Sequence, residues 1–257
     1  MPEFAANLSL LFTEYDLTDR FRAAASSGFR SAELLFPYEL PIETLKHALN
    51  SAGMSLTLIN TPAGDWAAGE RGFAALPGQE TTFKRGFETA LDYALTLNAT
   101  HIHVMAGVTD SPEAEETFIR NLTWAAAQAP GQSLTIEPIN PHDMPGYALD
   151  DFDHAARILD RIGAPNLHLQ FDAYHAHRIT GDLMGCWAQY GGRAAHIQIA
   201  GHPGRHEPVD GEINYPAFIR AVTTSGYKGA ISAEYFPATN TRAGLGWLEA
   251  WRPLLTP

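Results

Sequence analysis

Eight short, mostly apolar runs recur along the chain, and each is followed by a stretch with the spacing of an amphipathic helix. The first helical stretch extends from about Asp16 to Ser27, and several later ones end in Gly or Asn, as helices commonly do. Strands that alternate with helices in this way predict a parallel sheet covered by helices. The eight runs are FAANLSLLF, SAELLFP, SLTLIN, HIHVMAG, SLTIEPI, LHLQFDAYH, AAHIQIAG and GAISAEYFP.

Two architectures built from eight such units compete, an open doubly wound sheet and a closed barrel. No phosphate-binding GxGxxG follows the first run, and 257 residues is close to the roughly 250 typical of a (β/α)8 barrel. No linker or low-complexity segment interrupts the pattern. The sequence therefore predicts a single (β/α)8 barrel domain over residues 1–257, with its longest irregular stretch, residues 61–80, at a junction where barrels place active-site loops.

The composition narrows the classes of partner and compartment. Seventeen basic residues against 29 acidic ones give a formal net charge of −12, which disfavours nucleic acid and anionic membrane surfaces as partners. The chain contains no run of about 20 apolar residues and no leader-like start, and its lone Cys186 fits a reducing compartment. We expect a cytoplasmic protein that acts on a small molecule; the oligomeric state stays open, with a homo-oligomer among the alternatives.

Side chains alternate between two faces in four of the later runs. Apolar residues such as Ile136 and Ile197 occupy one face, and polar residues occupy the other. The apolar face of a barrel strand packs against the outer helices, so the polar face should point into the barrel. This parity predicts that four side chains converge where the strands end. They are Glu137, Asp172, Gln198 and Glu234.

Three carboxylates crowded together would repel one another unless a cation neutralised them. Three acid oxygens with one amide oxygen suit a hard ion better than Zn²⁺. The sequence therefore predicts one Mg²⁺ or Mn²⁺ held by these four residues. Ordinary polar strand ends are the alternative. His101 and His103 also face inward, but they precede the expected strand end at Gly107 by four or more residues, so we interpret them as barrel filling. For His103, support of a metal ligand is the alternative.

The chain resembles the hydroxypyruvate isomerase family of the xylose-isomerase-like barrels over nearly its whole length. The resemblance rests on motifs in the apolar runs and in the segments that follow them, from the start of the chain to its end. They are FAANLSLLFTE, ELLFPYE, NTPAGDW, GERG, HVMAG, IEPIN, DMPGY, QFDAYH, HIQIAGHPGRHEP, DGEINYP, AEYFP and GLGW. A close branch that isomerises 2-oxo-tetronate shares HVMAG, QIAG, RHEP, DGEINYP and GLGW, while EPIN with DMPGY favours hydroxypyruvate.

The resemblance implies a mechanism and a set of site residues. Glu137 and Glu234 correspond to the two glutamates that act as acid and base and also bind the metal, with Asp172 and Gln198 as the remaining ligands. Related ketose epimerases usually carry His at the position of Gln198. His175, Arg205 and, more weakly, Asp143 correspond to substrate-binding positions; the Arg205 guanidinium suits a substrate carboxylate, although a surface pair with Glu207 or Asp210 is the simpler alternative.

Hydroxypyruvate and tartronate semialdehyde interconvert by moving a proton between neighbouring carbons through an enediolate, which suits two opposed glutamates beside a metal. Three other functions remain open: a ketose 3-epimerase, an endonuclease-like barrel with several Zn²⁺ ions, and a non-catalytic protein that binds a sugar acid. The negative charge disfavours the endonuclease, and the two glutamates favour catalysis over mere binding.

Overall fold

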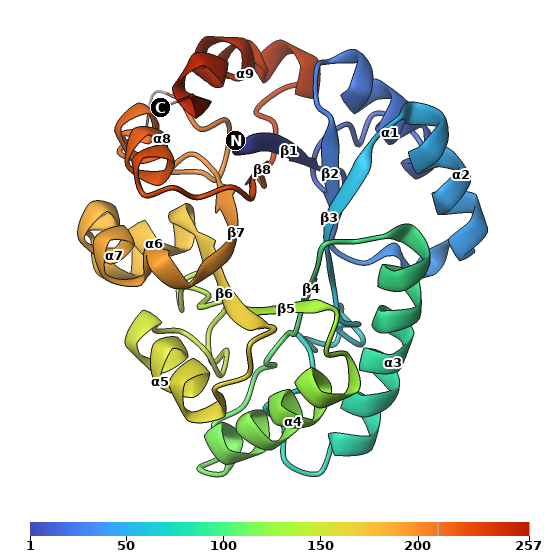
Figure 1. Ribbon diagram of the computed structural model, residues 1–257, viewed down its shortest axis with the longest axis vertical. Coiled ribbons are helices and arrows are strands. Elements are labelled where there is room, and N and C mark those ends of the chain that lie inside the picture. Colours follow the sequence, from blue (N-terminus) through green and yellow to red (C-terminus); the bar gives the residue numbers. More distant parts are fainter. Residues whose placement is uncertain (210, 257) are drawn as a thin grey trace.

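The computed structural model describes residues 1–209 and 211–256 and shows a closed barrel of parallel strands surrounded by helices (Figure 1). Each strand pairs with the next along the chain, and β1 closes the barrel by pairing with β8. The strands are β1 (Glu3–Asn7), β2 (Ser31–Leu34), β3 (Ser55–Asn60), β4 (His101–His103), β5 (Ser133–Ile136), β6 (Leu167–Asp172), β7 (Ala194–Ile199) and β8 (Ala230–Ala233).

Helices form the outer ring of the barrel (Figure 1). The α-helices are α1 (Leu17–Ser26), α2 (Ile42–Ala52), α3 (Glu80–Leu97), α4 (Ala114–Gln128), α5 (Phe152–Ile162), α6 (Ala173–Thr180), α7 (Leu183–Tyr190), α8 (Tyr215–Thr224) and α9 (Gly246–Trp251). Short 3-10 turns are η1 (Pro37–Glu39), η2 (Gly191–Arg193), η3 (Thr241–Gly244) and η4 (Arg252–Leu255). Among the described residues, no helix is both long and apolar enough to cross a bilayer.

The predicted alternation of faces agrees with the packing around β6. Phe171 points outward, where its ring meets Trp187 of α7 edge-on at 5.1 Å and stacks on Phe218 of α8 at 6.0 Å. Gln170 points the other way and bonds to polar side chains of neighbouring strands. Burial of aromatic rings between strands and helices is the main stabilising contribution on the outer face. The predicted barrel is therefore confirmed.

Several strands end earlier than the apolar runs suggest. β5 ends at Ile136 and β8 at Ala233, so Glu137 and Glu234 are the first residues after their strands. β4 ends at His103, and the expectation that it extends to Gly107 is wrong. Val104 N–H still donates to Thr135 C=O of β5 at 2.8 Å, but beyond it Ala106 forms an isolated bridge with Gly72, from the irregular stretch after β3. His103 thus lies at the end of its strand, level with the candidate site.

Candidate metal and substrate site

The four residues predicted to converge all lie buried at the carboxyl end of the barrel. The exposed fraction is 5% for Glu137, 1% for Asp172, 0% for Gln198 and 6% for Glu234. Asp172 is the last residue of β6 and also caps α6, because its Oδ1 accepts hydrogen bonds from the backbone N–H groups of Tyr174 at 2.7 Å and His175 at 3.3 Å. One strand-to-helix junction therefore fixes the direction of this carboxylate.

Arg205 reaches into the site from the connection between β7 and α8. Its Nη2 lies 2.6 Å from Glu234 Oε2 and 3.7 Å from Asp172 Oδ2, and its guanidinium lies over the Tyr174 ring at 5.2 Å. The backbone of Arg205 has φ +54, a left-handed conformation that costs a non-glycine residue about 1–2 kcal/mol. Phe236 N–H donates to its carbonyl at 2.9 Å and helps to hold that conformation.

The simpler alternative for Arg205 does not describe this arrangement. Glu207, one of its two suggested surface partners, accepts a hydrogen bond from the Ala238 backbone N–H at 3.2 Å. Asp210, the other, lies outside the described residues. The guanidinium instead contacts two of the predicted metal ligands, so it is a charged group of the site itself.

His175 faces two of the buried acids. Its Nε2 lies 3.6 Å from Asp172 Oδ2 and 3.9 Å from Glu137 Oε1. The backbone N–H of Asn140 donates to its Nδ1 at 3.3 Å, so the neutral ring carries its hydrogen on Nε2. Burial lowers the pKa of His175 well below its usual value, and the nearby Arg205 acts in the same direction. A neutral ring that presents an N–H to the site is suited to donate a hydrogen bond.

A layer of polar side chains supports the site from below. Gln170 Nε2 donates to Glu137 Oε2 at 3.0 Å and to Gln198 Oε1 at 2.7 Å. Gln198 Nε2 in turn donates to Glu33 Oε1 at 2.9 Å. Asn7 Nδ2 donates to Glu33 Oε1 at 2.7 Å and to Glu234 Oε1 at 3.2 Å. These bonds fix the orientation of three of the four predicted ligands.

Glu33 is the centre of this layer, and it is not among the site residues predicted from the sequence. It is fully buried, and its Oε2 also lies 2.6 Å from His196 Nε2. The parity of SAELLFP carries the signal, because Ala32 and Leu34 share one face while Ser31 and Glu33 share the other. Applied to the second strand, the same test would have placed Glu33 inside the barrel.

Burial raises the pKa of each of the three acids. For Glu137, which rises well above its usual value, the nearby Glu234 and Asp172 add to the effect of burial. Burial raises the pKa of Glu234 to about 8, although Arg205 opposes the shift. Burial also raises the pKa of Asp172, again against Arg205. Three acids that all resist ionisation together indicate a site suited to additional positive charge.

The donor set fits a divalent ion. Asp172 Oδ2 is buried and has no hydrogen-bond donor among the described residues, so one carboxylate oxygen is free to bind a cation. The carboxylates of Glu137 and Asp172 lie within 4.8 Å of each other and of His175, whose Nε2 hydrogen makes it a hydrogen-bond donor to the site and not a ligand in this tautomer. Glu234 and Gln198 are outside this compact group, because Arg205 holds the former while Gln170 and Glu33 hold the latter. The predicted set of four ligands and the nature of the ion stay predictions.

Two weaker candidates have clear positions. Asp143 pairs with Arg178 at 2.5 Å and accepts a hydrogen bond from Asn140 at 3.0 Å, so its charge is balanced at the rim. His103 Nδ1 lies 3.6 Å from Glu137 Oε2, and neither ring nitrogen has a hydrogen-bond partner among the described residues. His101 bonds to Ser133 at 2.8 Å deeper in the barrel. The filling role fits His101, whereas His103 contacts a predicted catalytic residue.

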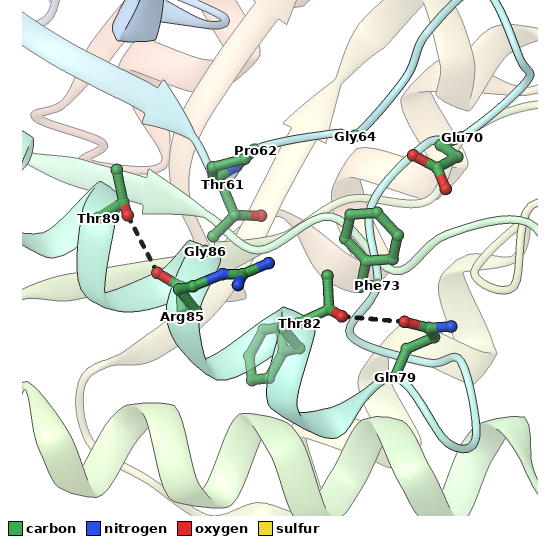
Figure 2. Close-up of a pocket in the computed structure, with 11 residues that line it drawn as sticks. Thr61, Pro62, Gly64, Glu70, Phe73, Gln79, Thr82, Arg85, Gly86 and Thr89 are labelled. Atoms are coloured by element: carbon green, nitrogen blue, oxygen red, sulfur yellow. Dashed lines mark hydrogen bonds between the residues drawn. The ribbon is translucent and has the colours of Figure 1, made fainter.

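A separate cavity of about 520 Å³ lies between the irregular stretch after β3 and helix α3. Figure 2 shows Arg85 and Thr82 on α3 opposite Pro62, Phe73 and Glu70. Its lining contains none of the seven predicted site residues. The cavity is lined by the stretch after β3 and by α3 and by no predicted site residue, so it is not the candidate site.

Comparison with known proteins establishes the family. A family model described as xylose isomerase-like TIM barrel matches residues 21–251. The chain belongs to the xylose isomerase-like TIM barrel family. It is 46% identical to the 2-oxo-tetronate isomerase of Cupriavidus necator over 98% of this chain and 99% of that protein. It is also 43% identical to the hydroxypyruvate isomerase of Escherichia coli over 98% of this chain and 100% of that protein.

A solved structure matches over the same length of this chain. It is named AP endonuclease, family 2, from Brucella melitensis, and it superposes with a TM-score of 0.95 at 41% identity, covering 98% of this chain and 100% of that chain. The predicted resemblance to hydroxypyruvate and 2-oxo-tetronate isomerases is confirmed, and with it the prediction that this family member is an isomerase.

Proposed function

We propose that this chain is a metal-dependent isomerase that interconverts hydroxypyruvate and tartronate semialdehyde. The observation that carries the proposal is the pair of buried glutamates, Glu137 after β5 and Glu234 after β8, with Arg205 and Asp172 between them. The relatives named for hydroxypyruvate and 2-oxo-tetronate support a short 2-oxo acid as substrate. Mg²⁺ or Mn²⁺ fits the oxygen-rich donors best.

The substrate carboxylate is proposed to bind Arg205, whose fork can grip two carboxylate oxygens at once. Glu234 shares that guanidinium, so substrate binding would weaken an existing hydrogen bond and free Glu234 to act on the substrate. His175 would donate its Nε2 hydrogen to a substrate oxygen. Asp172, Glu137, Gln198 and Glu234 would hold the metal, which when bound supplies a Lewis acid that polarises the substrate carbonyl.

The proton moves between two carbons. One glutamate, ionised, removes a proton from C3 of hydroxypyruvate, which gives the enediolate, and the other, protonated, delivers a proton to C2. The hydroxyl proton moves from the C3 oxygen to the C2 oxygen, so that C3 becomes the aldehyde and C2 carries the new hydroxyl. Proton exchange with water then restores the two glutamates. The raised pKa of Glu234, about 8, favours one protonated acid in the pair near neutral pH. Which glutamate removes the proton from hydroxypyruvate stays open.

2-Oxo-tetronate is the second candidate substrate, because the relative from Cupriavidus necator at 46% identity is named for it. A ketose epimerase would need the same acid pair but a neutral substrate, for which Arg205 has no evident partner. The nucleic-acid chemistry suggested by the name of the Brucella structure fits poorly with a net charge of −12. A sugar-acid binding protein without turnover would not need two glutamates whose pKa values are raised.

Cys186, unpaired and buried, is the ground for proposing a cytoplasmic location.

A turnover assay followed by proton NMR in D₂O tests the proposal. Hydroxypyruvate, 2-oxo-tetronates and ketoses are each incubated with protein reconstituted with Mg²⁺ or Mn²⁺. We expect isomerisation of a 2-oxo acid, loss of turnover after EDTA, and recovery on adding the ion. If only neutral ketoses were turned over, the substrate would be a ketose and not a 2-oxo acid. If the protein were fully active after exhaustive chelation, its activity would not depend on a metal.

A further inference from the structure

A second group of ligand-type side chains lies outside the barrel mouth, behind Tyr174. It consists of His177 from α6 with His202 and Glu212 from the connection between β7 and α8. Glu212 Oε2 lies 3.3 Å from His177 Nε2 and 3.6 Å from His202 Nε2. One ligand atom of each residue lies within 4.8 Å of the other two. Two segments far apart in the sequence therefore present three donors to one point.

The state of His202 indicates that its ring lacks a partner. The ring is largely buried, with 21% of the side chain exposed, and its Nδ1 is a buried atom without a hydrogen bond among the described residues. Its Nε2 faces Glu212 at a distance longer than a normal hydrogen bond. Burial lowers the pKa of His202, although Glu212 opposes the shift, so the ring is neutral and able to bind an ion near neutral pH.

We infer that His177, His202 and Glu212 form a second metal site, selective for a transition ion such as Zn²⁺. Two imidazole nitrogens and one carboxylate oxygen form a donor set that zinc accepts readily, with a fourth position for water. Mg²⁺ favours oxygen donors, so the four oxygen-rich residues in the mouth and this group should select different ions. The inference does not depend on which substrate the mouth accepts.

The location suggests a structural effect on the mouth. The connection that carries His202 and Glu212 also carries Arg205, and it folds back on itself through Glu212 N–H to His202 C=O at 2.8 Å and Gly201 N–H to His206 C=O at 2.8 Å. The His202 ring lies 5.9 Å from the ring of Tyr174, over which the Arg205 guanidinium lies. An ion bound by these three residues would link the connection between β7 and α8 to helix α6. It would thereby restrict the movement of the backbone that carries Arg205.

Metal counting on matched variants tests the inference. Wild type, Glu212→Gln, His177→Gln and the control His47→Gln, an exposed histidine on α2, are equilibrated with buffered Zn²⁺ and dialysed, and bound zinc is measured by mass spectrometry. We expect one zinc ion per chain fewer in Glu212→Gln and His177→Gln than in wild type and His47→Gln. Cobalt substitution should show the intense visible bands of a four-coordinate site in wild type and lose them in both variants.

Two further readouts keep the result clear. Glu212 is largely exposed, so Glu212→Gln should fold, which circular dichroism checks. Mn²⁺ binding at the mouth, measured by electron paramagnetic resonance, should be unchanged in that variant. Equal zinc content in wild type and both variants would overturn the second site. Loss of Mn²⁺ binding together with zinc would mean that the group only supports the fold. Neither outcome bears on whether hydroxypyruvate is turned over.

Discussion

Glu137 and Glu234 are the two glutamates among the four residues predicted to converge, and both are buried with a raised pKa. Replacing either with Gln keeps an oxygen but removes the group that exchanges the proton. Turnover of hydroxypyruvate should therefore fall by about 10²-fold or more in each variant. Steady-state kinetics with saturating Mn²⁺ checks this, with Glu249→Gln on the exposed face of α9 as the control. Turnover within a few fold of wild type for Glu137→Gln would assign its role to another group.

Arg205 makes a separate prediction about substrate charge. Arg205→Ala should lower kcat/KM for hydroxypyruvate by an amount that corresponds to roughly 2–4 kcal/mol of lost transition-state stabilisation. The reason is that the buried carboxylate of the substrate loses its partner. A neutral analogue such as dihydroxyacetone, if it is turned over, should lose far less. Arg205→Lys retains the charge without the fork and should fall between the two. Equal losses for the acid and the neutral substrate would mean that Arg205 acts only by holding Glu234 and Asp172 in place.

The junction of β6 with α6 combines a helix cap with a predicted metal ligand. Asp172→Ala removes both, whereas Asp172→Asn keeps an oxygen that can accept from the Tyr174 and His175 N–H groups. In protein freed of metal by chelation, the free energy of unfolding of Asp172→Ala should be about 0.5–2 kcal/mol lower than that of wild type. The free energy of unfolding of Asp172→Asn should fall much less. Urea titrations measure this. Both variants should bind Mn²⁺ poorly, and normal binding in Asp172→Ala would remove the residue from the metal site.

Strand parity was sufficient to predict where the later strands place their polar residues, because side chains alternate strictly along a strand. Thus Asp172 and Gln198 pair across β6 and β7 in the structure as the pattern requires. Parity did not predict the strand ends, which depend on contacts with loops. Beyond β4, Ala106 bridges Gly72, and His103 lies beside Glu137; no local pattern in HIHVMAG encodes either partner.

Closure of the barrel determines the contacts that the sequence could not predict. Glu33 and Gln198 are 165 residues apart, yet they bond across the barrel interior. The hydrogen bond from Arg205 to Glu234 likewise depends on how the connection after β7 folds back over the mouth. The residue types in the site could be predicted from the sequence, but the orientation of each depends on neighbours brought together only by the whole fold.

The buried acids make the stability of the whole molecule depend on pH and metal in a specific direction. The pKa of Glu234, raised to about 8 by burial, means that the folded state retains a proton that the unfolded state loses above its ordinary value of 4.5. The free energy of unfolding of chelated protein should therefore fall as pH rises towards 8, by at most about 1.4 kcal/mol per pH unit for one proton. Below about pH 6.5 buried neutral histidines act in the opposite direction, since burial lowers the pKa of His103 to about 3 and the unfolded chain gains that proton first.

The window from pH 6.5 to 8 therefore isolates the acids. Urea unfolding of EDTA-treated protein across this window should show decreasing stability in wild type, and the slope should be smaller in Glu234→Gln, which has no proton to lose at that position. Saturating Mn²⁺ should reverse the trend, because binding displaces the retained protons and becomes tighter as pH rises. A wild-type slope equal to that of Glu234→Gln would mean that Glu234 ionises normally in the folded chain. Metal stabilisation that does not grow with pH would show that the ion binds without displacing protons from these acids.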